Sequence, residues 1–179
     1  EMNPDGTDKK QVSSIDPGIN SFAWSPDGSK ILMTVDVKLD PTPQEIYPDL
    51  PETNVRIIDD LMYRHWNAWH DYAYSHIFVA SYDETGLAEP VDIMEGEPWD
   101  APLSPFFDDA EMTWSPDGKQ IAYTCKKMKG REYAISTNSD VYLYDLETGR
   151  LKNRITSGNW NVLQLMRIDR TGRSLYFMG

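Results

Sequence analysis

The amino-acid sequence predicts an all-β chain: a partial β-propeller of four-stranded antiparallel blades, with a short helical insertion in one blade. Three observations lead to this prediction. Residues 24–28 and residues 114–118 both read Trp-Ser-Pro-Asp-Gly, and each copy stands between two β-prone runs. A weaker copy of the same frame occupies residues 166–178, where Ile168 replaces the tryptophan. A frame that recurs along a chain marks one supersecondary unit that is used several times.

Each Ser-Pro-Asp-Gly segment predicts a tight turn that joins two short strands into a hairpin. Proline presets the backbone angle of the first central turn position, aspartate hydrogen-bonds the turn through its side chain, and glycine accepts a positive φ. The first strand of each hairpin ends in a tryptophan, Trp24 or Trp114. The large apolar ring of tryptophan suits a face that is buried between stacked sheets.

The second copy opens a complete four-stranded blade, which starts near Glu111. After the hairpin, residues 140–145 form a β-rich run, residues 146–149 read as a turn, and residues 150–156 read as a polar outer strand. Four antiparallel strands per repeat, with a turn signature in the first hairpin, are typical of a propeller blade.

The first copy opens a longer blade. Trp24 and Trp114 lie about 90 residues apart, roughly twice the period of a four-stranded blade. Residues 76–82 are predicted to be the third strand of this blade, and residues 90–94 the fourth. The excess length therefore predicts an insertion between the second and third strands, over residues 40–74.

Two features stand out in the insertion. Residues 55–66 carry apolar side chains at helical spacing, which predicts a short amphipathic helix. The aromatic side chains at its end and beyond are expected to cover an edge of the propeller; they are Trp66, Trp69, Tyr72 and Tyr74.

The predicted organisation has four parts. Residues 1–18 are the end of a preceding blade, with a turn and a fourth strand within residues 3–12. The following parts are the blade with the insertion, a second blade and the first half of a third, at residues 19–94, 95–156 and 157–179. A propeller closes its ring so that no strand edge stays bare, and two complete blades with two partial ones are too few. We therefore expect a fragment, or a subunit that closes its ring with other chains.

The composition excludes two classes of partner. The net charge is −12 and the isoelectric point is near 4.5, so no basic stripe is present for nucleic acid or for an anionic membrane surface. The one basic run, residues 126–131, is expected to be a solvated hairpin loop. No apolar run is long enough for a transmembrane helix. Cys125 is the only cysteine, so no internal disulfide forms.

No motif in the chain places a catalytic group. The strained Gly-x-Ser-x-Gly turn that carries the nucleophile of α/β-hydrolases is absent from the sequence. His65, His70 and His76 are five and six residues apart, whereas metal-binding pairs on a helix are four apart. We therefore expect no catalytic residue, no bound metal and no cofactor in these residues.

Longer motifs occur in a particular order. Residues 46–51 read Ile-Tyr-Pro-Asp-Leu-Pro, residues 56–66 read Arg-Ile-Ile-Asp-Asp-Leu-Met-Tyr-Arg-His-Trp, and residues 75–80 read Ser-His-Ile-Phe-Val-Ala. Glu-Gly-Glu-Pro follows at residues 95–98, and the strand with its turn closes the series at residues 136–149. Over about residues 3–156, this order resembles the amino-terminal propeller of bacterial prolyl-oligopeptidase-family serine peptidases, in the dipeptidyl- and acylaminoacyl-peptidase branch. The repeated pentapeptide is similar to the WD-type repeats of TolB-like and peptidase propellers.

The resemblance implies a function. In that family the propeller precedes an α/β-hydrolase domain that carries Ser, Asp and His. By resemblance, this chain is the non-catalytic, substrate-gating portion of a periplasmic or secreted serine exopeptidase that cleaves short peptides. Its implied partners are a peptide substrate and the missing hydrolase domain or remaining blades.

Three residues are candidates for contact with the substrate. Glu95, Glu97 and Trp99 fall in the connection between the first and second blades. Such loops lie on a propeller face, and in the resembling family one face lines the substrate cavity. A glutamate there would pair with the ammonium group of a peptide. Glu95 and Glu97 are not adjacent, unlike the glutamate pair with which some relatives hold the amino terminus of the substrate.

A second interpretation stays open. The chain would then be a TolB-like propeller scaffold that binds a protein partner and is no part of an enzyme. Self-association of a small propeller is a variant of this interpretation.

Overall fold

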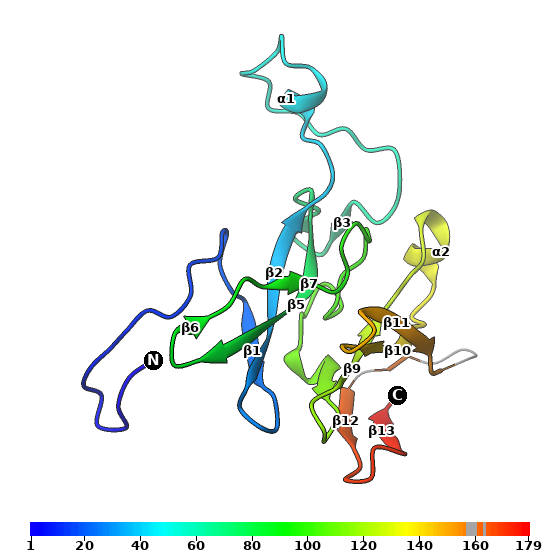
Figure 1. The fold of residues 1–179 in the computed structure, drawn as a ribbon. Coiled ribbons are helices and arrows are strands. Elements are labelled where there is room, and N and C mark those ends of the chain that lie inside the picture. The colour runs from blue at the N-terminus through cyan, green and yellow to red at the C-terminus, as the bar shows by residue number, and fades with distance from the viewer. Residues whose placement is uncertain (157–160, 163) are drawn as a thin grey trace.

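The computed structural model describes residues 1–156, 161–162 and 164–179, and the predicted fold class is confirmed. Within these residues the chain forms successive antiparallel sheets, with short helices in the connections (Figure 1).

The first sheet forms around the first copy of the pentapeptide. Its strands pair antiparallel in the order β1 (Ser21–Trp24), β2 (Lys30–Lys38) and β5 (Ala73–Asp83). Two short strands, β6 (Gly86–Leu87) and β7 (Val91–Asp92), both pair with β5. The predicted third strand lies within β5, and the predicted fourth strand contains β7.

The second sheet has the four strands that the repeat predicts. They are β8 (Met112–Trp114), β9 (Gln120–Cys125), β10 (Asp140–Asp145) and β11 (Arg150–Arg154), adjacent in that order and antiparallel. A short 3-10 helix, η1 (Asp109–Glu111), leads into β8, and the helix α2 (Gly130–Ile135) lies between β9 and β10.

A third hairpin follows, from β12 (Gln164–Ile168) and β13 (Leu175–Met178). The half-blade predicted over residues 157–179 includes residues 157–160 and 163, which lie outside the described residues.

The two Trp-Ser-Pro-Asp-Gly turns are built alike. Ser25 Oγ donates to Asp27 Oδ1 at 2.6 Å, and Ser115 Oγ donates to Asp117 Oδ1 at the same distance of 2.6 Å. Each serine oxygen also accepts the backbone N–H five residues on, at 2.9 Å in both turns. These bonds tie each turn to the start of its second strand, so the serine and the aspartate are both needed at their positions.

The third turn keeps this bridge with donor and acceptor exchanged. Asp169 stands at the serine position and Thr171 at the aspartate position, and Thr171 Oγ1 donates to Asp169 Oδ2 at 2.9 Å. Asp169 Oδ1 also accepts the backbone N–H of Arg173 at 2.9 Å. The weaker copy is therefore the same turn in different residues.

The sheets stack face to face, and Trp114 lies between the first two. Trp114 is 9% exposed, and its indole Nε1 donates to the backbone oxygen of Ala23 in β1 at 3.3 Å. The core between the sheets takes residues from both; its largest fully buried members are Leu32, Ile77, Met94, Ile121 and Tyr123. The opposite face of the second sheet packs on the third hairpin through Ala122, Val141, Val162 and Ile168.

Trp24 occupies the equivalent position in the first sheet. It pairs in register with Ile31, as Trp114 pairs with Ile121. Trp24 is nevertheless 46% exposed. Among the described residues, Ile15 and Ile19 are the ones from outside the first sheet that pack on the face of Ile31 and Met33. Both belong to a single extended segment, so this face is covered less than the face that meets the second sheet.

The helix predicted over residues 55–66 is wrong. The insertion instead contains the one-turn helix α1 (Pro43–Ile46) and a small hairpin of β3 (Arg64–His65) and β4 (Ala68–Trp69). An isolated amphipathic helix of this length is unstable unless its apolar face is buried, and the apolar residues concerned are exposed: Val55, Ile57, Ile58 and Leu61. The helix forms instead where Pro43 opens the first turn and Thr42 with Glu45 makes a capping box.

The strand predicted within residues 3–12, whose partner was expected before Glu1, does not form in the structure. No described residue before Ser21 belongs to a strand. The predicted turn is present, because Gly6 N donates to Asn3 O at 2.9 Å, and the segment closes on itself where Lys10 N donates to Glu1 O at 2.8 Å. A fourth strand forms only by pairing with a third strand, and the described residues supply none next to it.

Candidate functional site

The long connections collect at one end of the stacked sheets. Residues 39–72 join β2 to β5, residues 93–108 join the first sheet to the second, and residues 126–139 join β9 to β10. Antiparallel strands put all three connections at the same end and the short hairpin turns at the other. Figure 1 shows this arrangement, with α1, β3 and α2 at the upper end and the β1–β2 and β12–β13 turns at the lower end. We call these three connections the loop face.

The three predicted site residues all lie on the loop face, in residues 93–108. Glu95 is exposed and has no hydrogen bond or ion pair with another described side chain. Glu97 is half-buried, and its carboxylate accepts a hydrogen bond from Lys127 Nζ. Trp99 is half-buried against the core between the sheets, and its ring centroid lies 5.6 Å from Lys129 Nζ.

Lys127 determines what Glu97 does in this arrangement. The Lys127 ammonium group also lies 4.6 Å from the ring centroid of Tyr142, so it is held between a carboxylate and an aromatic face. A peptide ammonium group would have to displace it from Glu97. The observed role of Glu97 is to tie residues 93–108 to the second sheet, and Glu95 is the carboxylate left facing solvent.

The prediction that residues 126–131 form a solvated loop is wrong for Lys126 and Lys127, whose ammonium groups both bind other parts of the chain. Besides the Lys127 contact, Lys126 Nζ donates to Tyr133 O at 2.6 Å and to Ser136 O at 2.5 Å. Burial lowers the pKa of Lys126. Lys126 thus satisfies carbonyl groups at the end of α2, a usual role for lysine at a helix C-terminus. The sequence held one signal for the Glu97–Lys127 contact, because residues 95–97 are acidic and residues 126–131 are basic. This signal can be used only when the two segments are known to be neighbours in the fold.

A buried histidine fixes the start of the predicted site segment. His76 in β5 is fully buried; its Nδ1 lies 2.7 Å from Asp92 Oδ2, and its Nε2 lies 2.8 Å from Glu97 O. Both partners are acceptors, so both ring nitrogens carry protons and the ring is an imidazolium. Burial opposes this charge, but the hydrogen bond and the charge of Asp92 outweigh burial, and the pKa of His76 is raised.

A second polar cluster anchors the base of the insertion. Asp40 Oδ2 accepts a hydrogen bond from the Tyr74 hydroxyl at 2.8 Å and lies 2.8 Å from His70 Nε2. Nearby, Asp100 Oδ1 accepts the backbone N–H of Ser75 at 2.9 Å, and burial raises the pKa of Asp100 to about 6. Two of the three histidines therefore pair with carboxylates. In the described part of the chain, no group of three or more His, Cys, Asp or Glu residues could hold a metal ion.

The tip of the insertion carries an open hollow of about 500 Å³, where aromatic rings and an arginine meet. The Tyr63 and Trp69 rings stack there with their centroids 5.9 Å apart. Trp66 meets the edge of Phe106, from residues 93–108, at 6.3 Å. Trp66 and Trp69 are 78% and 41% exposed, so they do not cover a sheet edge as expected. The hollow is lined by Leu61, Met62, Tyr63, Arg64, Trp66 and Trp69.

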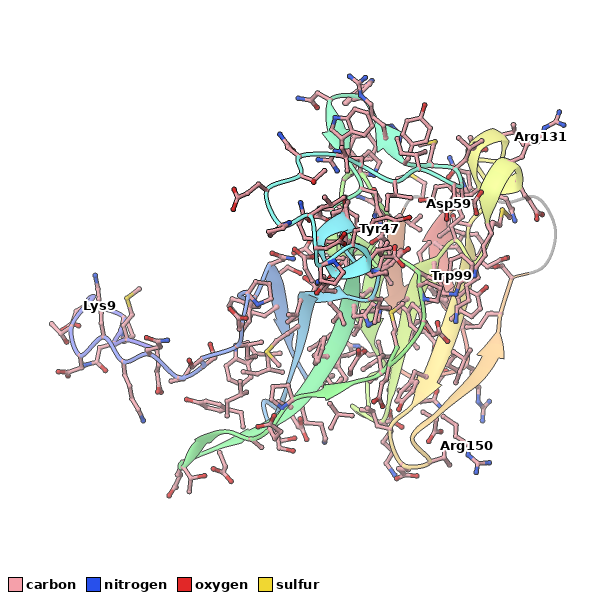
Figure 2. The ribbon with its side chains drawn as sticks, turned by 90° about the horizontal axis from the view of Figure 1, so that it is seen from above. Lys9, Tyr47, Asp59, Trp99, Arg131 and Arg150 are labelled. Atoms are coloured by element: carbon pink, nitrogen blue, oxygen red, sulfur yellow. The ribbon has the colours of Figure 1, made fainter. Side chains whose placement is uncertain are left out.

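The insertion also reaches the second sheet. A methyl group placed on Gly130 at the start of α2 would lie 2.7 Å from Asp60 Oδ1. Figure 2, seen from above, shows Asp59 of the insertion on the side of the molecule where α2 carries Arg131. The loop face is therefore continuous from the insertion to α2.

The single cysteine is no nucleophile in this fold. Cys125 is fully buried in the core between the sheets, and burial raises the pKa of its thiol far above the usual value. The thiolate is the reactive form, so a buried thiol of this kind is inert.

Among the helices of the described residues, none has the length and apolar character needed to cross a membrane.

Comparisons with known proteins agree with the resemblance predicted from the sequence. The family model described as "Dipeptidyl peptidase IV (DPP IV) N-terminal region" matches residues 126–179. A dipeptidyl-peptidase 5 of Porphyromonas endodontalis is 44% identical over 155 residues, which are 87% of this chain and 22% of that protein. A dipeptidyl-peptidase 5 of Porphyromonas gingivalis is 45% identical over 136 residues, which are 76% of this chain and 20% of that protein.

The similarity is thus to one part of much longer proteins, because the chain spans about a fifth of the length of these curated relatives. Among solved structures, TolB from Acinetobacter baumannii overlays with a TM-score of 0.44 and 22% identity, over 87% of this chain and 25% of that chain. The predicted resemblance to a propeller domain of dipeptidyl-peptidase-like proteins is confirmed.

Proposed function

We propose that this chain, which matches part of the dipeptidyl-peptidases 5, is the non-catalytic propeller portion of a serine exopeptidase. In this proposal the loop face controls which peptides reach a Ser-His-Asp site carried by other residues. The observation that carries the proposal is the 44% identity over 87% of the chain to a dipeptidyl-peptidase 5. Two features of the chain support it: the absence of a Gly-x-Ser-x-Gly turn and the burial of Cys125, so the chain offers no motif-placed nucleophile of its own.

The arrangement of the loop face supports a role in gating. It combines an exposed carboxylate, Glu95, with half-buried Trp99 and the open aromatic tip of the insertion around Trp66. A carboxylate can pair with a peptide ammonium group, and aromatic rings can contact apolar side chains. Because Lys127 already neutralises Glu97, Glu95 is the residue that we assign to the substrate.

Two assays test the proposal. The chain alone should release no product from dipeptidyl or acyl-aminoacyl chromogenic substrates, and turnover would refute its non-catalytic role. In the full-length protein, Glu95→Gln should raise KM about tenfold for substrates with a free amino terminus, because one charge-assisted hydrogen bond is lost.

The matched control is Glu84→Gln, which neutralises an exposed glutamate in the turn after β5, at the opposite end of the sheets. It should leave KM unchanged. An equal effect of the two variants would remove Glu95 from the substrate site. A full-length protein that cleaves none of these substrates would favour the alternative, a TolB-like scaffold that binds a protein partner.

A further inference from the structure

The insertion of this acidic chain carries a small positively charged patch, formed by Arg56 and Arg64. Arg56 and Arg64 both lie over the Trp69 ring, with their guanidinium carbons 5.0 and 5.3 Å from its centroid. The chain has a net charge of −12, yet neither arginine is in a salt bridge with a described carboxylate. The neighbouring Asp60 directs Oδ1 to the backbone N–H of Leu61 at 2.8 Å. Two cations therefore share one ring, and no acidic partner for them is present among the residues that the structure describes.

The hydrogen bonds of Arg64 leave its carboxylate-binding edge available. Arg64 Nε donates to Trp66 O at 2.8 Å, which orients the guanidinium group from one side. Arg56 Nη1 donates to His70 O at 3.2 Å and holds the second guanidinium group over the same ring. The two terminal nitrogens of Arg64 remain, and this edge forms two parallel hydrogen bonds with a carboxylate.

The hollow places apolar surface beside this edge. Arg64 lines the hollow together with the stacked rings of Tyr63 and Trp69 and with Trp66, which is 78% exposed. The last residue of a peptide carries a carboxylate and a side chain on one carbon atom. That single residue can therefore reach the cation and the aromatic wall at once, whereas an acidic side chain within a peptide brings no apolar group on the same carbon.

We propose that the hollow at the tip of the insertion binds the carboxy-terminal residue of a peptide. Its carboxylate pairs with Arg64, with Arg56 adding positive charge, and an aromatic or branched side chain packs on Tyr63, Trp66 and Trp69. The inference rests on the proposed function in one respect, that the peptide is a substrate. The binding itself requires no hydrolysis and is tested separately.

Calorimetric titration of the full-length protein with peptides that have acetylated amino termini tests the site. The acetyl group removes the free ammonium group, so pairing with Glu95 does not contribute to the measured affinity. N-acetyl-Ala-Ala-Phe as the free acid should bind about tenfold more tightly than its amide, and about tenfold more tightly than N-acetyl-Ala-Ala-Gly as the free acid. Equal affinity of acid and amide, or no measurable binding of the Phe acid, would overturn the proposal. An amide that carries an internal aspartate and binds as well as the free acid would also overturn it.

Variants locate the effect. Arg64→Gln should reduce the ratio of acid to amide affinity to about one, and Arg64→Lys, which keeps the charge but not the paired donors, should give an intermediate ratio. The control Arg150→Gln removes one exposed arginine at the start of β11, away from the insertion (Figure 2), and should keep the wild-type ratio. A wild-type ratio in Arg64→Gln would contradict the assignment.

The outcomes separate the two proposals. Preference for the free acid without any peptidase turnover would remove the proposed function and leave the binding site. Turnover without this preference would remove only the site.

Discussion

His76 is a cation enclosed by the fold, and its charge has consequences for stability. Its pKa is raised above the usual value near 6.5, so the stabilisation is complete below about pH 6.5 and is lost as the pH rises through the raised value. Removing one partner of a buried ion pair costs about 3–5 kcal/mol. We therefore expect His76→Gln to lower the free energy of unfolding by about that amount at pH 6, and by less at pH 9, in urea denaturation.

His65 supplies the control. It lies in the insertion hairpin, where its ring meets Trp66 at 6.1 Å. His65→Gln should change the free energy of unfolding little at either pH. A His76→Gln penalty of the same size at pH 6 and pH 9 would contradict the imidazolium assignment.

Glu111 is a buried carboxyl group with the same direction of pH dependence. Burial raises its pKa to about 7, although its carboxylate accepts the backbone N–H of Leu103 at 2.6 Å. The folded state therefore favours the protonated form, and the stabilisation present below about pH 4.5 is lost as the pH rises through 7. Glu111→Gln keeps the acceptor and removes the charge, so it should raise the free energy of unfolding by about 2–3 kcal/mol at pH 8.

At pH 4 the same Glu111→Gln substitution should have little effect, because Glu111 is then protonated in both states. The exposed Glu132 in α2 is the matched control, and Glu132→Gln should be neutral at both pH values. Denaturation curves of the Glu111 variant and of the wild type that coincide at pH 8 would mean that Glu111 is not destabilised by its charge.

Secondary-structure elements could be predicted where local chemistry alone determines them. Ser25 with Asp27, and Ser115 with Asp117, form their turns from bonds within six residues, so the hairpins were evident in the sequence. The helix prediction for residues 55–66 was wrong because local chemistry alone does not determine the structure there. Its apolar spacing allows a helix, but burial decides whether one forms, and Ile57 and Ile58 are exposed.

Gly28, in the turn between β1 and β2, has a backbone conformation that most residues avoid. Gly28 has a φ of +72°, and a Cβ placed on it meets no atom within 4 Å. Gly28→Ala should therefore cost only backbone strain, about 1–2 kcal/mol in the free energy of unfolding. Gly28→Asn should cost less, although asparagine is larger, because asparagine tolerates this conformation. A greater loss for asparagine than for alanine in thermal denaturation would show that sterics, not φ, govern the turn.

At the scale of the whole molecule, the two repeat tryptophans should differ in importance. Trp114 is 9% exposed between two sheets, whereas Trp24 is 46% exposed. Trp114→Ala should cost about 3–5 kcal/mol of unfolding free energy, and Trp24→Ala about 1 kcal/mol or less. Trp114→Phe keeps most of the apolar contact and loses the 3.3 Å bond to Ala23 O, so its penalty should be intermediate. Equal penalties for the two alanine variants in chemical denaturation would contradict the stacking.

The candidate site shows the limit of sequence reasoning at this scale. The segment with Glu95, Glu97 and Trp99 could be placed on a face, because strand order determines the end at which a connection lies. The partner of Glu97 could not be foreseen, because Lys127 is 30 residues away and lies in the connection between β9 and β10. The arginines over Trp69 were missed for a similar reason, since the hairpin that brings them together lies in a region predicted to be helical.

The stacking of the sheets gives the molecule a direction. The second sheet turns its Trp114 side toward the first sheet and its Ala122 side toward the third hairpin, where Ile168 stands at the tryptophan position. The two ends of the stack of sheets are therefore unlike surfaces. Two copies that met through these ends would join front to back, whereas a two-fold symmetric pair would have to use the rims instead.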